Sequence, residues 1–238
     1  MPSTGTIAVA YAGIGSGHRT CAEGIAAELA GRDDAPRVEL LDILDYAKPQ
    51  LSGNRLTSTF TGPTAGIYDA MWGSPAWGSL SRAVSGPLYD LMFAGFMRAL
   101  DELQPKVVVC THAAAAVMAS RAKVRGRATW DVVNVTTDFG VHGYWPRDGV
   151  SLFCVADEIS AEVLLQRGFE ESTIAVTGIP VRRQFAVEYD KAASLDHFGL
   201  QPDKRTVLAL AGASLPGPYK RFKESLAVAL PAIASLPN

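Results

Sequence analysis

The stretch "YAGIGSGHRTCAEGIAAEL" (residues 11–29) joins an apolar run to an alanine-rich segment with helical spacing. The two parts are separated by three glycines, Gly13, Gly15 and Gly17. Glycine permits backbone conformations that other residues avoid, and it lets a ligand approach the main chain. The stretch therefore predicts a strand at 6–12, a tight turn, and a helix at 17–31 whose amino end faces a ligand.

The rest of the chain repeats this alternation of strand and helix. Apolar runs that predict strands occur at 38–44, 106–112, 130–138, 152–157 and 173–178. Helical patterns follow at 113–124 and 158–167. The runs are apolar on both faces, as is typical of a parallel sheet covered by helices on both sides. We therefore expect an α/β fold, a doubly wound (Rossmann-like) parallel sheet, with its ligand crevice at the carboxyl ends of the strands.

Two segments depart from this rhythm. Residues 46–104 are too long for one crossover and predict a mainly helical insertion rich in aromatic residues and methionine. Most of these side chains should pack on the sheet, but Trp72, Trp77 and Phe93 are also candidates for membrane contact.

The second departure is the tail, residues 201–238, which has the pattern of a new strand, a glycine turn and a helix at 219–236. A lone unit of this kind cannot bury its own faces. We expect residues 1–200 to form one domain and 201–238 to begin a second domain whose remainder is missing from this sequence.

Composition excludes several classes of protein. The chain has 238 residues, a formal net charge of −2 and 48% hydrophobic residues, which indicates a globular core and no general affinity for nucleic acid. Its three cysteines are scattered and should be reduced, which favours the cytoplasm. We find no signal peptide and no apolar run long enough to span a bilayer, although contact with a membrane surface stays open.

His18 stands where a dinucleotide-binding fingerprint would carry its last glycine. The helix dipole lowers the pKa of a histidine at this position, and a neutral imidazole in an open crevice can take a proton from a hydroxyl. The alternative is a capping or solvated histidine. Asp42, at the end of the second predicted strand, keeps an NAD-binding oxidoreductase open as another alternative.

A second group of polar residues lies in "TTDFGVHGYWPRD" (136–148), at the same predicted edge of the sheet. Asp138 and His142 either orient a substrate hydroxyl or belong to an ordinary turn. His112, Asp138 and His142 lack the spacing of a metal site, so no metal is expected. Farther along, Arg182 and Arg183 suit either phosphate and lipid headgroups or a solvated linker.

Four stretches together resemble a known family: "GIGSGHRTCAEGIAAEL", "VELLDILDY", "NVTTDFGVHGYWPRDGVSLFCVADE" and "TIAVTGIPVRRQF". Their order and spacing are similar to those of the monogalactosyldiacylglycerol synthase and processive diacylglycerol glucosyltransferase family, which is related to the lipid II-forming GlcNAc transferase. The resemblance implies a GT-B glycosyltransferase whose amino-terminal domain binds the lipid acceptor and whose carboxyl-terminal domain binds a UDP-sugar.

The resemblance also implies roles for single residues. His18 would be the general base of an inverting hexose transfer to diacylglycerol, and Gly15, Gly17, Asp138, His142 and Trp145 would border the acceptor. UDP-sugar would be a co-substrate, with no cofactor, and the enzyme would be cytoplasmic and peripheral at the membrane. Gly15-Ser16-Gly17-His18 fits the family's G-x-G-H loop, whereas Thr111-His112-Ala113 lacks the proline often found there.

Because the sugar-binding half is not in this sequence, the chain alone should be inactive. A non-catalytic module that binds lipid or a partner is the main alternative, and an NAD-dependent oxidoreductase is the second.

Overall fold

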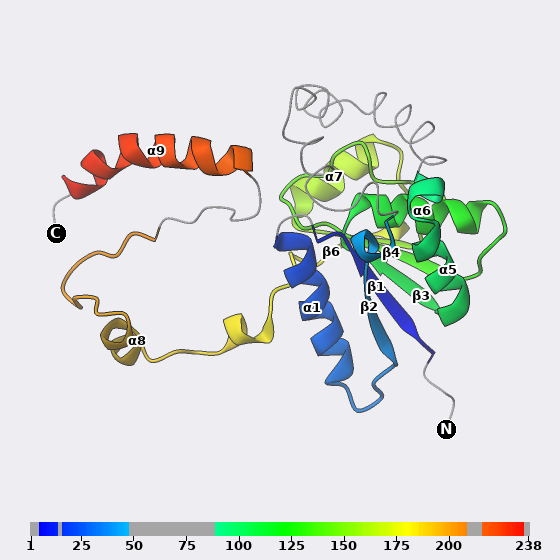
Figure 1. Cartoon of the computed structure of the whole chain (residues 1–238), viewed down its shortest axis with the longest axis horizontal. Coiled ribbons are helices and arrows are strands. Elements are labelled where there is room, and N and C mark those ends of the chain that lie inside the picture. Colours follow the sequence, from blue (N-terminus) through cyan, green and yellow to red (C-terminus); the bar gives the residue numbers. More distant parts are fainter. Residues whose placement is uncertain (1–4, 14–15, 48–88, 209–215, 236–238) are drawn as a thin grey trace. The chain divides into compact units, whose positions relative to one another are not determined.

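The computed structural model describes residues 5–13, 16–47, 89–208 and 216–235 (Figure 1). The chain divides into two compact units, Met1–Arg182 and Arg183–Asn238. The sequence predicts a boundary at 200/201 between an acceptor-binding domain and the start of a donor-binding domain. The division into two compact units does not test which ligand each part binds, so that boundary stays a prediction.

The first unit is built on a six-stranded sheet with the order β2-β1-β3-β4-β5-β6. Every neighbouring pair is parallel, which confirms the predicted α/β class. The strands are β1 Ile7–Tyr11, β2 Val38–Asp42, β3 Val107–Cys110, β4 Asp131–Val135, β5 Leu152–Val155 and β6 Ile174–Val176. Each lies within a predicted range, because runs apolar on both faces are stable only when both faces are covered.

The helices of the described ranges divide between the two faces of the sheet. Alternate strand residues point to opposite faces, so the two hydrophobic clusters identify which helix covers which face. On one face α1 (Gly17–Ala30) packs Cys21 and Ala22 against Val9 and Val109. The other face carries Ala8, Ala10 and Val108 and is covered by α5 (Ala94–Leu103), α6 (Ala113–Val124) and α7 (Glu158–Gln166).

The strand order locates the crevice. β2 lies beside β1 at one end of the sheet. The chain then returns through α5 to β3 on the other side of β1, and β4, β5 and β6 follow in order toward the opposite end. As a result α1 leaves β1 toward one face while α6 leaves β3 toward the other. A ligand crevice forms at such a switch point, at the carboxyl ends of the two strands.

The described part of the insertion packs into the core. Phe93, Phe96, Met97 and Leu100 recur at helical spacing and are buried together against the sheet. The predicted membrane contact of Phe93 is therefore wrong: only 2% of this residue is exposed, because it belongs to the apolar face that docks α5. Trp72 and Trp77, the other two candidates in the insertion, lie outside the described residues.

The second unit contains the 3-10 turn η3 (Arg183–Ala186), α8 (Lys191–His197) and α9 (Pro216–Ala234). The helix predicted at 219–236 is confirmed by α9. Of the strand predicted before it, residues 201–208 are described and form none, and 209–215 are outside the described part. No helix in the described ranges has the length and apolar character needed to cross a bilayer.

Candidate functional site

His18 lies in the first turn of α1, at the switch point of the sheet. Its Nδ1 is 2.7 Å from the carbonyl oxygen of Thr111 and 3.1 Å from Oγ1 of Thr137. The hydroxyl of Thr111 in turn donates to the carbonyl oxygen of His18 at 3.0 Å. Since Thr111 follows β3 and Thr137 lies just beyond β4, the ends of two adjacent strands hold the ring.

These contacts decide where the ring proton sits. A carbonyl oxygen only accepts hydrogen bonds, so Nδ1 of His18 must be the donor to Thr111. In the neutral ring, Nε2 then carries the free lone pair. Among the described residues nothing forms a hydrogen bond with Nε2. The ring is part-buried, and Nε2 is the ring nitrogen that the described residues leave without a hydrogen bond.

The surroundings of His18 keep it neutral. Burial lowers the pKa of His18, and this effect outweighs the Thr111 carbonyl and the Asp138 carboxylate, which both raise it. A neutral imidazole near pH 7 can accept a proton, as a general base must.

His112, the N-cap residue of α6, stands beside this ring. The centroids of the two imidazoles are 4.7 Å apart and their planes lie at 84°. Nδ1 of His112 accepts a hydrogen bond from the backbone nitrogen of Ala114 at 3.1 Å. Burial, assisted by His18 and His142, lowers the pKa of His112 to about 3. Sequence reasoning considered His112 only as a weak metal ligand and missed this contact, although its position after the third strand was the available signal.

The three predicted site residues in the loop after β4 differ in their exposure and in their contacts. Asp138 is exposed and acts on His18 through its charge. His142 is part-buried, accepts a hydrogen bond from the backbone of Tyr144 at 3.3 Å, and has its pKa lowered to about 4, first by burial and then by Arg167 and His18. Trp145 is buried and packs edge-on against Phe153, with ring centroids 5.4 Å apart.

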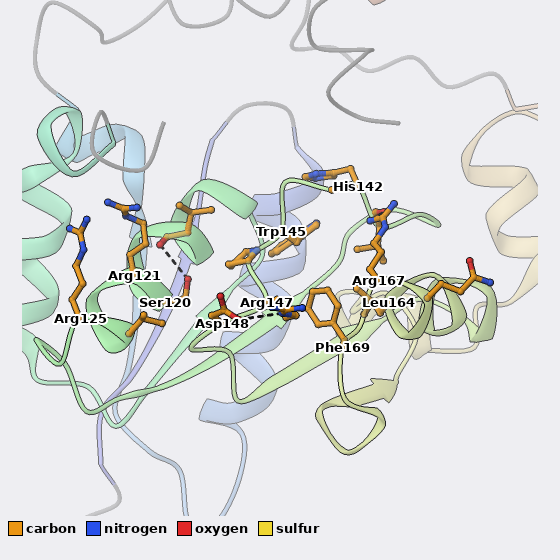
Figure 2. A pocket seen from close by; sticks show the side chains of 16 residues that line it. Ser120, Arg121, Arg125, His142, Trp145, Arg147, Asp148, Leu164, Arg167 and Phe169 are labelled. Atoms are coloured by element: carbon orange, nitrogen blue, oxygen red, sulfur yellow. Dashed lines mark hydrogen bonds and ion pairs between the residues drawn. The ribbon is translucent and has the colours of Figure 1, made fainter. Parts of the chain in front are cut away.

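A cavity of about 570 Å³ opens beneath His142 and Trp145 (Figure 2). The connection from β4 to β5 contains no helix, and its loop closes this space between α6 and α7. The apolar part of the wall comes from residues such as Val141, Leu164 and Phe169. His142 and Trp145, two of the predicted acceptor residues, line the cavity, and His18 does not.

Four arginines also line the cavity, Arg121, Arg125, Arg147 and Arg167. Two of them share the carboxylate of Asp90, and a third pairs with Asp148. The fourth, Arg167, donates to the carbonyl oxygen of Val141. The four cations thus face two carboxylates, and the cavity is positively charged as well as apolar.

The glycine turn is held by Asp42. Its Oδ1 accepts hydrogen bonds from the backbone nitrogens of Gly13 and Leu44, each at 3.0 Å. The carboxylate that the NAD-binding alternative requires for a ribose is thus bonded to the main chain. Gly17 is exposed at the first position of α1, and Gly15 lies outside the described residues.

The two arginines after β6 differ in their surroundings. Arg182 donates to Glu23 at 2.8 Å and to Thr20 at 3.5 Å, both on α1. Arg183 is exposed and begins η3 in the second unit. Contact of either arginine with lipid stays a prediction. Within the described ranges, no three His, Cys, Asp or Glu side chains are arranged to hold a metal ion.

Comparison with known proteins identifies the family. The family model described as monogalactosyldiacylglycerol (MGDG) synthase matches residues 18–181, which is more than half of the chain. The chain belongs to the MGDG synthase family. The matched range begins at His18 and includes Asp138, His142 and Trp145, so family membership confirms the resemblance and disfavours the oxidoreductase alternative.

Relatives within the family are longer than this chain. The processive diacylglycerol beta-glucosyltransferase of Bacillus licheniformis is 34% identical over 140 residues, covering 57% of this chain and 36% of that protein. The uncharacterized glycosyltransferase YkoN of Bacillus subtilis is 30% identical over 196 residues, covering 79% of this chain and 50% of that protein. The chain thus spans half or less of the length of these two relatives.

Among solved structures, the apo form of the lipopolysaccharide outer core galactosyltransferase WaaB matches with a TM-score of 0.43 and 12% identity. The match covers 72% of this chain and 44% of that one.

Proposed function

We propose that this chain is the acceptor-side domain of an inverting hexosyltransferase that transfers a hexose from a UDP-sugar to diacylglycerol. The observation that carries the proposal is the orientation of His18, whose Nδ1 is bonded to Thr111 and whose Nε2 is left for a hydroxyl. Family membership supports the same reaction class, since a relative in Bacillus licheniformis is named a processive diacylglycerol beta-glucosyltransferase.

In the proposed reaction, Nε2 of His18 takes the proton of the acceptor hydroxyl as that oxygen attacks the anomeric carbon of the sugar. The bond from the anomeric carbon to UDP breaks with its electron pair on the phosphate oxygen, and the configuration inverts. The imidazolium that forms is stabilised by the Thr111 carbonyl and by the charge of Asp138, the same two groups that raise the pKa of His18.

The proposed acceptor site extends from His18 to the loop after β4. Gly15 and Gly17 would let the acceptor approach the first turn of α1, while Asp138 would border its hydroxyl end. The apolar walls beside His142 and Trp145 suit the hydrocarbon of a lipid. The UDP-sugar would bind the carboxyl-terminal domain that residues 201–238 are expected to begin.

We further propose that the protein works at the membrane surface from the cytoplasm, without a metal or other cofactor and without nucleic acid. A lipid acceptor supports the surface location, because an alcohol embedded in a bilayer reaches an enzyme only at the interface.

The test assays this chain, and a longer natural protein containing it, with UDP-glucose and UDP-galactose against diacylglycerol in micelles. The His18→Gln substitution should lower kcat/KM of the longer protein by roughly 10²–10⁴-fold. The matched control is His197→Gln, which changes an exposed histidine of the second unit and should leave the rate unchanged.

A His18→Gln protein that keeps its rate would refute the base. Lipid binding without any product from either UDP-sugar would favour the binding-module alternative.

A further inference from the structure

We propose that His112 is a positioning residue for His18: edge-to-face packing of the two imidazoles holds the plane of the His18 ring, in which the Thr111 carbonyl keeps Nδ1 on its own side and leaves Nε2 for the acceptor. The inference rests on the proposed role of His18 as the base. It adds a second histidine that touches no reacting atom and acts only through the first.

The two imidazoles have opposite neutral tautomers, each fixed by a hydrogen bond to the main chain. Nδ1 of His18 donates to the Thr111 carbonyl at 2.7 Å, so the ring proton of His18 is on Nδ1. Nδ1 of His112 accepts from the nitrogen of Ala114 at 3.1 Å, so the ring proton of His112 is on Nε2. Each tautomer is imposed by the main chain, which removes the ambiguity that a neutral histidine otherwise has.

The packing geometry restricts rotation of the His18 ring. The centroids are 4.7 Å apart at an interplanar angle of 84°, within the range of favourable edge-to-face contacts. A half-turn of the His18 ring would keep its plane and the ring contact but break the short hydrogen bond to Thr111, whereas any intermediate rotation would break both. Thr137 adds a second oxygen on the same side, 3.1 Å from Nδ1.

His112 also stays uncharged beside His18. Its Nδ1 lone pair caps α6, so protonation of that nitrogen would cost the cap as well as place a cation at a helix amino end. The ionisable groups that act on His18 and His112 from the neighbouring loop are Asp138 and His142. A neutral ring beside His18 therefore excludes water without adding a positive charge.

The experiment separates the ring of His112 from its capping nitrogen with two substitutions. His112→Asn keeps a side chain that caps helices well but removes the ring. His112→Phe keeps a flat ring but removes the acceptor. The tautomer and pKa of His18 are measured in the 238-residue chain by long-range proton–nitrogen NMR of the imidazoles across a pH titration. Thermal unfolding of the same samples reports on the cap.

In the unaltered protein we expect His18 in the Nδ1–H form. In His112→Asn the Thr111 carbonyl should keep the ring proton of His18 on Nδ1, while the pKa of His18 should rise because its ring is less buried. In His112→Phe the state of His18 should be preserved, while Tm falls by about 2–4 °C through loss of the cap. A folded His112→Asn protein with an unaltered His18, or a His112→Phe protein in which His18 changes equally, overturns the inference. If His112→Asn does not fold, His112→Ser, which also caps helices and lacks a ring, takes its place in the comparison.

Activity provides a separate readout in the longer natural protein. His112→Asn should lower kcat and move the acid limb of kcat/KM to higher pH, with KM for the acceptor unchanged. If His18→Gln retains the rate while the NMR results hold, the proposed function fails and the positioning of His18 by His112 stands.

Discussion

The backbone nitrogen of Gly13 donates a 3.0 Å hydrogen bond to Oδ1 of Asp42, which ties the start of the glycine turn to the end of the neighbouring strand β2. The same oxygen accepts a bond from the nitrogen of Leu44 and caps the short helix η1 (Ile43–Tyr46). One carboxylate thus organises two connections at the edge of the sheet where His18 lies.

Replacing Gly13 by alanine should break this link. The added Cβ would clash with Oδ2 of Asp42, and the carboxylate has to turn to relieve the clash, which weakens the bonds that its Oδ1 accepts from the two backbone donors. We expect the free energy of unfolding, measured by urea denaturation, to fall by about 1–3 kcal/mol. Gly17→Ala is the matched control, because its Cβ meets nothing within 4 Å and should change stability by less than about 0.5 kcal/mol. Equal losses in the two proteins would contradict the assignment.

The stability of the chain should decrease in mild acid because of His142 and His112. Their pKa values in the folded state are about 4 and about 3, below the ordinary value of 6.5. Between the ordinary and the lowered pKa the unfolded chain binds more protons, so stability is lost as pH falls through that window. His142 alone contributes a loss of up to about 3 kcal/mol by pH 4.

The measurement is urea denaturation at several pH values between 7 and 4. His142→Gln should flatten the dependence on pH relative to the unaltered protein. If His142→Gln leaves the slope of the free energy of unfolding against pH unchanged, the imidazole of His142 is not desolvated as described.

Gly149 should tolerate no side chain. Its φ is +78°, and an added Cβ would lie 2.7 Å from the carbonyl oxygen of Ser120 on α6. Gly126 is the matched control, with a similar φ of +69° but open space around the added atom. We expect Gly126→Ala to cost about 1–2 kcal/mol, the ordinary penalty of left-handed backbone. Gly149→Ala should cost at least about 1 kcal/mol more, and equal costs would refute the close packing of this loop on α6.

Arg183 should contribute more than Arg182 to binding at a negatively charged membrane. The guanidinium of Arg182 is already bonded to Glu23, whereas Arg183 is exposed. One basic residue near an anionic surface contributes about 1 kcal/mol, so Arg183→Ala should weaken sedimentation with anionic phospholipid vesicles roughly fivefold. Arg182→Ala should have a smaller effect. Loss of binding only in Arg182→Ala, or none in either, would remove this contact from the proposal.

Several features of the site followed from local sequence alone. Runs apolar on both faces predicted the six strands of the described sheet, and the glycines before a helical pattern placed His18 at its carboxyl edge. The family resemblance was confirmed for the same reason, since its motifs are short and continuous. Phe93 was assigned wrongly, because an apolar side chain in a helical pattern suits a lipid and a sheet equally well and only the docking of α5 decides.

The sequence of this protein determined its alternation of strands and helices, because the spacing of apolar residues along a segment indicates whether one face or both faces are buried. Tertiary structure alone decided the state of His18. Its ring nitrogen meets Thr111 across 93 residues of chain and Thr137 across 119, and His112 joins it from the far side of the switch point. A tautomer and a pKa depend on what lies within a few ångströms of one ring, and no local pattern specifies which distant segments come that close.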